Sequence, residues 1–173
     1  HIYCLDSIKS EPTIQQISSL IQTINNRKFD LIIALGGGSV IDTAKILSVL
    51  LLVKDKTEIR NLFVNHKKNL FSSSIPIYAF PSTAGSGAEL TPFATIWDKE
   101  LKLKYSLESR KMIPKIAVYD HKLLKSIPKT VSISSGLDTI SHALESTWNL
   151  SSTPITLLLS SKSLELSINS IRS

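Results

Sequence analysis

The chain has 173 residues, a length that suits one domain or one domain with part of a second. With 42% hydrophobic and 20% charged residues its composition is globular, which excludes the disordered and fibrous classes. One cysteine excludes an internal disulfide, and the longest apolar run, residues 46–53, falls far short of the roughly 20 residues that span a bilayer. We therefore expect a soluble, cytoplasmic protein with no membrane partner.

The net charge of +6 raises nucleic-acid binding as an alternative. The basic residues are scattered except in two small clusters, residues 66–68 and 99–104, and neither cluster is interleaved with aromatic side chains. Such lysines usually form a solvated surface, and a site for an anionic small molecule is the main alternative. We expect no nucleic-acid partner.

Helices and strands alternate over the first two-thirds of the sequence. Apolar residues recur at helical spacing over residues 14–24, and Pro12-Thr13 suits a helix start. Residues 29–35 predict a buried strand, followed by GGGS and a second helix to about residue 53. Three more strands are predicted, at residues 75–80, 93–98 and 115–120. This alternation is typical of a parallel α/β sheet.

From Val131 the pattern changes to two long helices, residues 131–150 and 155–171, with no strand predicted between them. We place a domain boundary near residues 128–131. The prediction is an α/β domain over residues 1–130, followed by the first helices of an all-helical domain over residues 131–173.

The stretch LIIALGGGSVIDTAK predicts a strand, a glycine turn and a helix. Glycines allow close approach of the backbone to a ligand, and the free N–H groups of a helix start attract phosphate, so we expect a phosphate site. The stretch matches neither the Rossmann glycine fingerprint nor the P-loop. The alternative is a tight turn with a capping box, in which Ser39 is the N-cap and Asp42 the third helical residue; both can hold for Ser39.

A second candidate loop, PSTAGSGAELT over residues 81–91, follows a predicted strand and is rich in small and hydroxyl residues. Loops of this composition are common, so the stretch is weak evidence alone. At the carboxyl end of a parallel strand, however, it fits the edge of a ligand crevice.

Asp138 and His142 are four residues apart in a predicted helix, so their side chains lie on one face. Two ligand-type residues in this arrangement suggest half of a metal site. The alternative is an exposed polar face or a local hydrogen bond. His66 and His121 lie in predicted loops and receive no role.

Taken together, GGGSVIDTAK, PSTAGSGAE, the stretch from Asp98 to Asp120 and GLDTISHALE resemble the iron-containing (group III) alcohol dehydrogenase family, in order and spacing, over nearly the whole chain. The resemblance implies a Rossmann-like α/β domain that binds NAD or NADP. It also implies an all-helical domain of the dehydroquinate synthase-like fold, and a metal, Fe²⁺ or Zn²⁺, held between the two. We expect a homodimer.

The resemblance also assigns residues to the cofactor and the metal. The family's pyrophosphate loop falls on Gly37, Gly38 and Ser39, with Asp42 near the nicotinamide end. The remaining assignments are cofactor contacts at Thr83, Ser86 and Lys104, and metal ligands at Asp138 and His142. The family's other two metal ligands, and its strand that separates NAD from NADP, fall outside this chain, so we expect a sequence truncated at both ends.

Within the family, FATIWD with LKYSLES, and HALESTWN, resemble the branch that reduces phosphonoacetaldehyde to 2-hydroxyethylphosphonate. The expected function is therefore hydride transfer between a nicotinamide and a small aldehyde or primary alcohol. The alternatives are a glycerol dehydrogenase or other polyol dehydrogenase, a dehydroquinate synthase-like lyase, and a fragment that binds nucleotide without catalysis.

Overall fold

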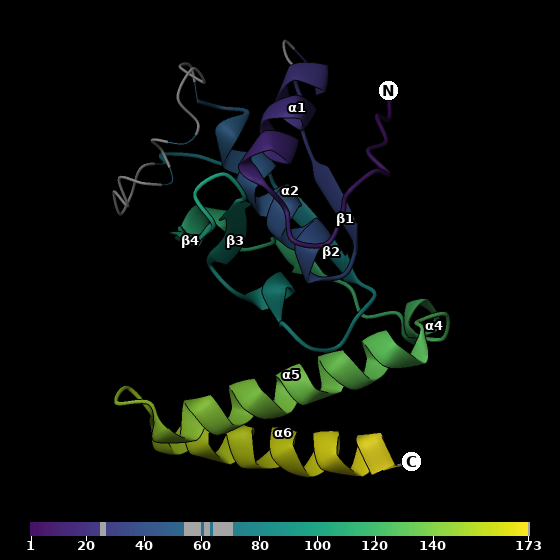
Figure 1. Cartoon of the computed structure of the whole chain (residues 1–173), viewed down its shortest axis with the longest axis vertical. Helices are drawn as coiled ribbons and strands as arrows, with labels where there is room; N and C mark the ends of the chain where they lie inside the picture. The colour runs from purple at the N-terminus through teal and green to yellow at the C-terminus, as the bar shows by residue number, and fades with distance from the viewer. Residues whose placement is uncertain (25–26, 54–59, 61–62, 64–70, 173) are drawn as a thin grey trace. The chain divides into compact units, whose positions relative to one another are not determined.

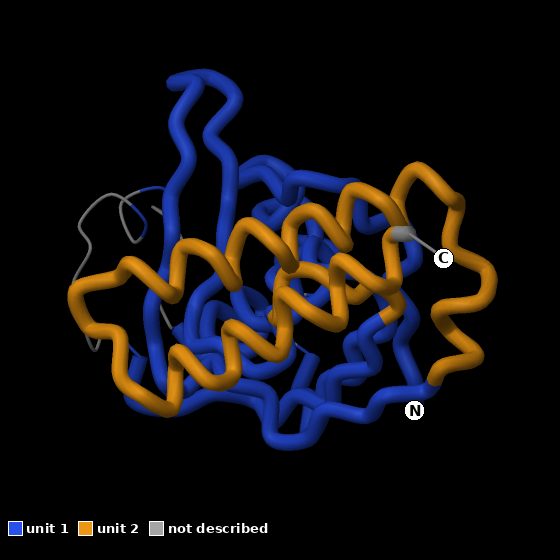
Figure 2. The backbone as a smooth tube through the Cα atoms, turned by 90° about the horizontal axis from the view of Figure 1, so that it is seen from below, with its two compact units in different colours: residues 1–81, 88–120 blue, residues 82–87, 121–173 orange. Residues whose placement is uncertain are grey.

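The computed structural model describes the whole chain except residues 25–26, 54–59, 61–62, 64–70 and 173. The basic cluster at residues 66–68, with His66, lies outside the described residues. Figure 2 shows the two compact units into which the chain divides. Unit 1 contains residues 1–81 and 88–120, and unit 2 contains residues 82–87 and 121–173. Among the helices described, none is long and apolar enough to cross a bilayer.

Helix α1, Ile14–Ile24, confirms the first predicted helix (Figure 1). Thr13 caps it, because its Oγ1 accepts a hydrogen bond from the Gln16 backbone N–H at 3.1 Å. The apolar residues of α1 recur every three or four positions and therefore form a single face. That face is buried and consists of Ile14, Ile17, Leu20, Ile21 and Ile24.

A three-stranded parallel sheet in the order β1-β2-β5 forms the centre of unit 1. Strand β1, Ile32–Gly36, begins three residues after its predicted start, and β2, Ile77–Pro81, lies within two residues of its predicted position. Strand β5 is only Ile116–Ala117 where residues 115–120 were predicted. Gly36 pairs with Pro81 across the sheet, so the chain leaves β1 and β2 at the same edge.

The strand predicted at residues 93–98 exists as β3, Phe93–Asp98, but it is not part of the parallel sheet. It pairs antiparallel with β4, Leu103–Glu108, which the sequence analysis did not predict. The connection, residues 99–102, is too short for a parallel crossover and suits a hairpin. In β4 only Tyr105 and Leu107 are buried, and they alternate with exposed polar residues. The segment therefore lacks the continuous apolar run by which the other strands were predicted.

Helix α2, Gly38–Leu50, lies between two apolar clusters of unit 1. One side packs on the sheet, and the other packs on α1 and the β3–β4 hairpin. A helix covered on two sides is apolar over most of its circumference, which explains the long apolar run at its C-terminal end. The sheet-side cluster consists of Ala34, Ile41, Ala44, Ile77, Ala79 and Ala88. The larger cluster includes Ile17, Leu20, Ile46, Leu50, Ile96, Leu107 and Met112.

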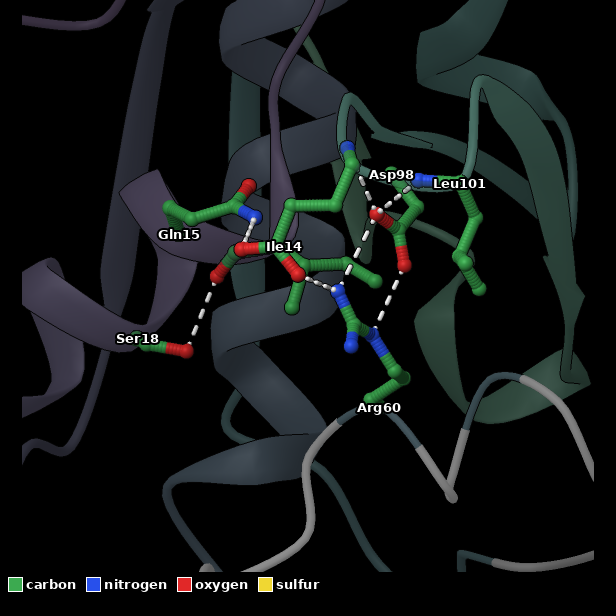
Figure 3. Close-up of polar contacts among 7 residues, drawn as sticks. Ile14, Gln15, Ser18, Arg60, Asp98 and Leu101 are labelled. Atoms are coloured by element: carbon green, nitrogen blue, oxygen red, sulfur yellow. Dashed lines mark hydrogen bonds and ion pairs between the residues drawn. The ribbon is translucent and has the colours of Figure 1, made fainter.

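A buried carboxylate, Asp98, closes the turn after β3 (Figure 3). Its Oδ1 accepts the backbone N–H groups of Glu100 and Leu101 at 3.0 and 3.1 Å, and its Oδ2 lies 2.7 Å from Nε of Arg60. Burial opposes ionisation, but the Leu101 N–H and the Arg60 guanidinium together lower the pKa of Asp98 below its ordinary value. Arg60 also pairs with Glu100.

In its described residues, unit 2 consists of three helices, the segments that connect them, and the loop of residues 82–87. A short helix α4, His121–Leu124, precedes α5, Lys129–Trp148, and α6, Pro154–Arg172. The helices α5 and α6 run side by side as a hairpin (Figures 1 and 2), in which the hydroxyls of Ser146 and Ser160 are 2.7 Å apart. The domain boundary expected near residues 128–131 stays a prediction for the complete protein.

Candidate functional site

The glycine turn begins α2 differently from the predicted capping box. Gly37 is the N-cap and makes no side-chain cap hydrogen bond, and the helix starts at Gly38. Ser39 is therefore the second residue of the helix, and its Oγ accepts the Glu11 N–H at 3.3 Å. The capping box of Ser39 and Asp42 is wrong, because the glycines move the helix start two residues upstream. The first N–H groups of α2 have no side-chain cap, as a phosphate site requires.

Gly36 is needed for the close approach of α2 to the end of β1. A Cβ at this position would lie 2.6 Å from Cγ2 of Val40, which is closer than two carbon atoms can approach. Any larger residue would push the start of α2 away from the sheet edge.

Asp42 lies one turn into α2, and its carboxylate is held from two sides. Oδ2 accepts the backbone N–H of Thr95 on β3 at 3.0 Å, and Oδ1 lies 4.0 Å from Nζ of Lys45. The side chain is 17% exposed, so part of the carboxylate still faces solvent. Burial raises the pKa of Asp42, while the Thr95 N–H and the ammonium groups of Lys45 and Lys104 act in the opposite direction.

Lys45 is a site residue that the sequence analysis missed. It is completely buried, and Nζ donates to the Phe93 carbonyl at 2.8 Å and to Oγ1 of Thr91 at 3.1 Å. Burial lowers the pKa of Lys45, while the carboxylates of Asp42 and Glu89 act in the opposite direction. The available signal was a lysine within an apolar stretch, three residues after an aspartate, on a helix that is buried nearly all round.

Lys104 is exposed on β4, and its ammonium lies 5.6 Å from the ring centroid of Trp97. It also lies close enough to Asp42 for its charge to oppose the rise in the pKa of Asp42 that burial causes. Unit 1 therefore contains five of the predicted cofactor residues, namely Gly37, Gly38, Ser39, Asp42 and Lys104, with Asp42 and Lys104 near each other.

Residues 82–87 of the predicted hydroxyl loop belong to unit 2, where they pack against α5, whereas its remaining residues belong to unit 1. The carbonyl of Ala84 accepts the Thr139 hydroxyl at 3.1 Å, and Gly85 lies against the backbone of Ser135. Within this loop, Thr83 is half-buried and Ser86 is exposed. The loop is thus attached to the helix that carries the predicted metal ligands.

Asp138 and His142 lie on one face of α5, as predicted, with Nε2 of His142 3.7 Å from Oδ1 of Asp138. Both side chains are about half exposed, at 47% and 52%. The separation is less than twice a zinc–ligand bond of about 2.1 Å, so both atoms can reach one ion. A local hydrogen-bonded pair fits the same geometry. Within the part of the chain that the structure describes, no group of three or more His, Cys, Asp or Glu side chains gathers to hold a metal.

A parallel sheet with a glycine turn opening an uncapped helix places unit 1 among Rossmann-like α/β domains. The family model for iron-containing alcohol dehydrogenases matches residues 1–121, and the chain belongs to this family.

Three relatives illustrate the likeness. The alcohol dehydrogenase of Thermococcus barophilus is 30% identical over 168 residues, which are 95% of this chain and 44% of that protein. The structure of sulfoacetaldehyde reductase from Bifidobacterium kashiwanohense in complex with NAD⁺ is 26% identical, with a TM-score of 0.85, and the match covers 93% of this chain and 42% of the other. The structure of the alcohol dehydrogenase from Oenococcus oeni is 30% identical, with a TM-score of 0.84, and the match covers 95% of this chain and 42% of the other. The chain spans less than half the length of each relative.

Proposed function

We propose that the complete protein is a metal-dependent, NAD- or NADP-linked alcohol dehydrogenase or aldehyde reductase. It would transfer hydride between the nicotinamide and a small aldehyde or primary alcohol. The observation that carries the proposal is the uncapped start of α2, with Asp42 and Lys104 near each other in the same unit. Family membership supports it.

The cofactor's pyrophosphate would bind the N–H groups of the glycine turn, because a helix start carries unpaired donors and a partial positive charge. Lys104 would add a positive charge for the cofactor phosphates. Asp42 would accept a hydrogen bond from the nicotinamide end, since its carboxylate is partly exposed. Thr83 and Ser86 would contribute hydroxyls from the loop on unit 2. The NAD⁺ in the structure of the sulfoacetaldehyde reductase supports this assignment.

Asp138 and His142 would supply two ligands to a divalent metal, Fe²⁺ or Zn²⁺, because a carboxylate and an imidazole suit either ion. When bound, such an ion polarises a carbonyl or stabilises an alkoxide. The role of α5 is to hold both donor atoms on one face, 3.7 Å apart.

The leading substrate is phosphonoacetaldehyde, reduced to 2-hydroxyethylphosphonate. The resemblance of residues 93–98 and 103–109 to that branch supports it, as do the basic residues between Lys99 and Lys115. The relative that reduces sulfoacetaldehyde also supports an anionic aldehyde, because both compounds carry an acidic group next to a two-carbon aldehyde.

Titration of NADH fluorescence tests the cofactor site. Gly38→Val should abolish binding, since a side chain there would block approach of the pyrophosphate to the helix start. Gly136→Ala on α5 is the matched glycine control and should bind normally. Normal NADH binding by Gly38→Val would show that the site is assigned wrongly.

A substrate panel tests the rest of the proposal in the complete protein. We expect phosphonoacetaldehyde, and more weakly sulfoacetaldehyde, to be reduced in preference to uncharged aldehydes. Preference for glycerol or simple alcohols would favour a polyol dehydrogenase of the same fold, and NADH binding without turnover would favour a binding protein. Sedimentation of the same sample tests the proposed homodimer.

The isolated 173-residue chain should hold metal poorly and be inactive, since a catalytic zinc site normally uses about three protein ligands plus water. Metal analysis after gel filtration, with the complete protein as control, measures this. Stoichiometric metal in the short chain, lost on Asp138→Ala, would contradict the expectation.

A further inference from the structure

Strand β4 has one edge that faces β3 and one that faces away from it. Within the part of the chain that the structure describes, β4 pairs with β3 alone, as a two-stranded sheet (Figure 1). The pairing runs from Phe93–Glu108 to Asp98–Leu103 without a bulge. A regular strand whose second edge is open can accept a further strand.

Two hydrogen bonds show which residues of β4 face the open edge. In an antiparallel pair, residues alternate between those that bond to the opposite strand and those that point away from it. The Ser109 N–H donates to the Pro92 carbonyl at 3.0 Å, whereas Thr95 on β3 donates its N–H to the Asp42 carboxylate. Alternate residues of β4 therefore direct their N–H and C=O groups away from β3. These residues are Lys104, Ser106 and Glu108, whose side chains are exposed.

The corresponding edge of β3 is occupied by α2. The outward-facing N–H of Thr95 is bound by Asp42, and the outward-facing carbonyl of Phe93 is bound by Lys45. The β3–β4 hairpin can therefore be extended at β4 and not on the side of α2.

The outward-facing residues of β4 are complementary to a second copy of themselves. If two β4 strands run antiparallel with Ser106 opposite the partner's Ser106, Lys104 lies opposite the partner's Glu108. Each opposed pair would exchange backbone hydrogen bonds, and the charged pairs would attract each other. Other registers among these three residues place a charge opposite serine or opposite its own kind.

The other face of β4 would contribute apolar contacts in the same register. Tyr105 and Leu107 would lie opposite the partner's Leu107 and the partner's Tyr105, which extends the apolar row across the interface. Leu103 at the end of this row is 47% exposed and would be covered in part.

We propose that β4 is a dimer interface, at which two copies of the chain join their β3–β4 hairpins into one antiparallel sheet with Ser106 at the two-fold axis. The inference rests on the homodimer of the proposed function and defines the surface that forms it. A two-fold interface uses the same patch on both subunits, which a self-complementary strand satisfies. The alternative role of Lys104 and Glu108 is to keep other strands away from the edge.

Engineered disulfides test the register in the complete protein, in a Cys4→Ser background that removes the exposed native thiol. Ser106→Cys should cross-link the dimer on mild oxidation, because residues opposed in this way lie about 5.5 Å apart at Cα, within the range that a disulfide spans. Glu108→Cys is the matched control. Its two copies would lie about 14 Å apart, since they are offset along the strands, and should not cross-link.

Ser106→Pro tests the backbone pairing. The Ser106 N–H points away from β3, so proline removes an outward donor and leaves the hydrogen bonds between β3 and β4 intact. Sedimentation equilibrium should show at least about a tenfold increase in the dimer dissociation constant, because both copies lose the donor at the two-fold axis. Ser106→Thr keeps the N–H and should stay within about twofold of the wild type.

Glu108→Lys tests the charges and covers the case in which Ser106→Pro does not fold, since Glu108 is exposed. It places like charges opposite each other and should raise the dissociation constant about fivefold, and less at high salt. The double variant Lys104→Glu/Glu108→Lys exchanges the two charges and should restore dimerisation. NADH binding is measured separately, because Lys104 also belongs to the proposed cofactor site.

The possible failures are distinguishable. A wild-type protein that stays monomeric at high concentration overturns the proposed homodimer together with this interface, whereas NADH titration and the substrate panel still decide the enzymatic proposal. A dimer in which Ser106→Cys does not cross-link, or in which Glu108→Cys cross-links as readily, overturns the β4 interface alone. So does a dimer that Ser106→Pro and Glu108→Lys leave unchanged, since another strand or surface would then form it.

Discussion

Helix α2 and the α5–α6 hairpin are both rich in apolar residues, but they differ in what covers them. Nine residues of α2 are buried within unit 1, including two polar ones with hydrogen-bond partners, Thr43 and Ser48, and the lysine described above. Among the residues of α5 and α6 whose side chains the structure describes, the buried ones are Ala143 and Ser160, whereas Leu158 is 71% exposed. Unit 1 therefore has an apolar core of its own, whereas the α5–α6 hairpin leaves large apolar side chains exposed.

The largest effect expected from this comparison is on core packing. Ile46→Ala should lower the free energy of unfolding by about 2–5 kcal/mol, because Ile46 on α2 is completely buried against α1 and the β3–β4 hairpin. Leu158→Ala on α6 should change stability by no more than about 0.5 kcal/mol. Urea denaturation in a Trp148→Phe background, which leaves Trp97 as the reporter, measures the first; hydrogen exchange of α6 amides measures the second. A large cost for Leu158→Ala would mean that the face of α6 is already covered.

Asp98 makes the stability of unit 1 depend on pH. Among the pKa shifts described above, none lies in the α5–α6 hairpin. Its pKa is lower in the folded than in the unfolded chain, so the unfolded state binds more protons and stability rises with pH. The contribution is fully present above the unfolded pKa of about 3.9 and is lost as the pH falls through the folded value. Asp98→Asn should therefore lower the urea midpoint at pH 7, and its difference from the wild type should shrink as the pH is lowered below about 3.9. Equal differences at both pH values would contradict this account.

Two glycines of unit 2, Gly85 in the hydroxyl loop and Gly136 on α5, should respond differently to replacement by alanine. Gly85→Ala places a Cβ 2.9 Å from the carbonyl oxygen of Ser135, a backbone atom, and should cost about 1–3 kcal/mol as the loop or helix shifts. In Gly136→Ala the new Cβ instead meets Cδ1 of Ile171, the movable end of a side chain, at 3.0 Å. This variant should be neutral or gain up to about 1 kcal/mol of helix propensity. Hydrogen exchange of α5 amides compares the two.

The smallest expected effect belongs to the exposed ion pair on α6. Nζ of Lys162 lies 3.0 Å from the Glu165 carboxylate, but both side chains are more than half exposed. Lys162→Ala should change the thermal midpoint by the equivalent of less than about 1 kcal/mol, and added salt should reduce the difference further. A larger, salt-independent loss would indicate that the pair is buried by an additional contact.

The elements with strong periodicity could be predicted from the sequence, and the elements without it could not. The spacing of Ile14, Ile17 and Ile21 predicted α1, and the four-residue spacing of Asp138 and His142 predicted their common face. Strand β4 was missed because it buries only two residues, Tyr105 and Leu107, which alternate with polar ones, and nothing local marks its pairing with β3.

The site was predictable as a set of residues but not as a set of contacts. Ser39 and Asp42 have the spacing of a capping box, but the local pattern does not specify where the helix starts after three glycines. The partner of the Asp42 carboxylate, Thr95, is 53 residues away, and Lys45 is identified as part of the site only by its burial. These long-range contacts depend on the packing of α2 against the β3–β4 hairpin.

The chain segment before α1 also affects how the β3–β4 hairpin can associate. The Trp97 N–H donates to the Pro12 carbonyl at 2.8 Å, and Thr13 forms a parallel bridge with Trp97. An open strand edge can recruit a strand from another molecule and start aggregation. Because residues 12–13 occupy the edge of β3 at this point, that end of the strand is closed to addition of a foreign strand. Proline suits the position, since it has no N–H with which to extend the pairing outward. Loss of this segment would therefore expose a site for intermolecular strand pairing next to Asp98, the carboxylate on which the turn depends.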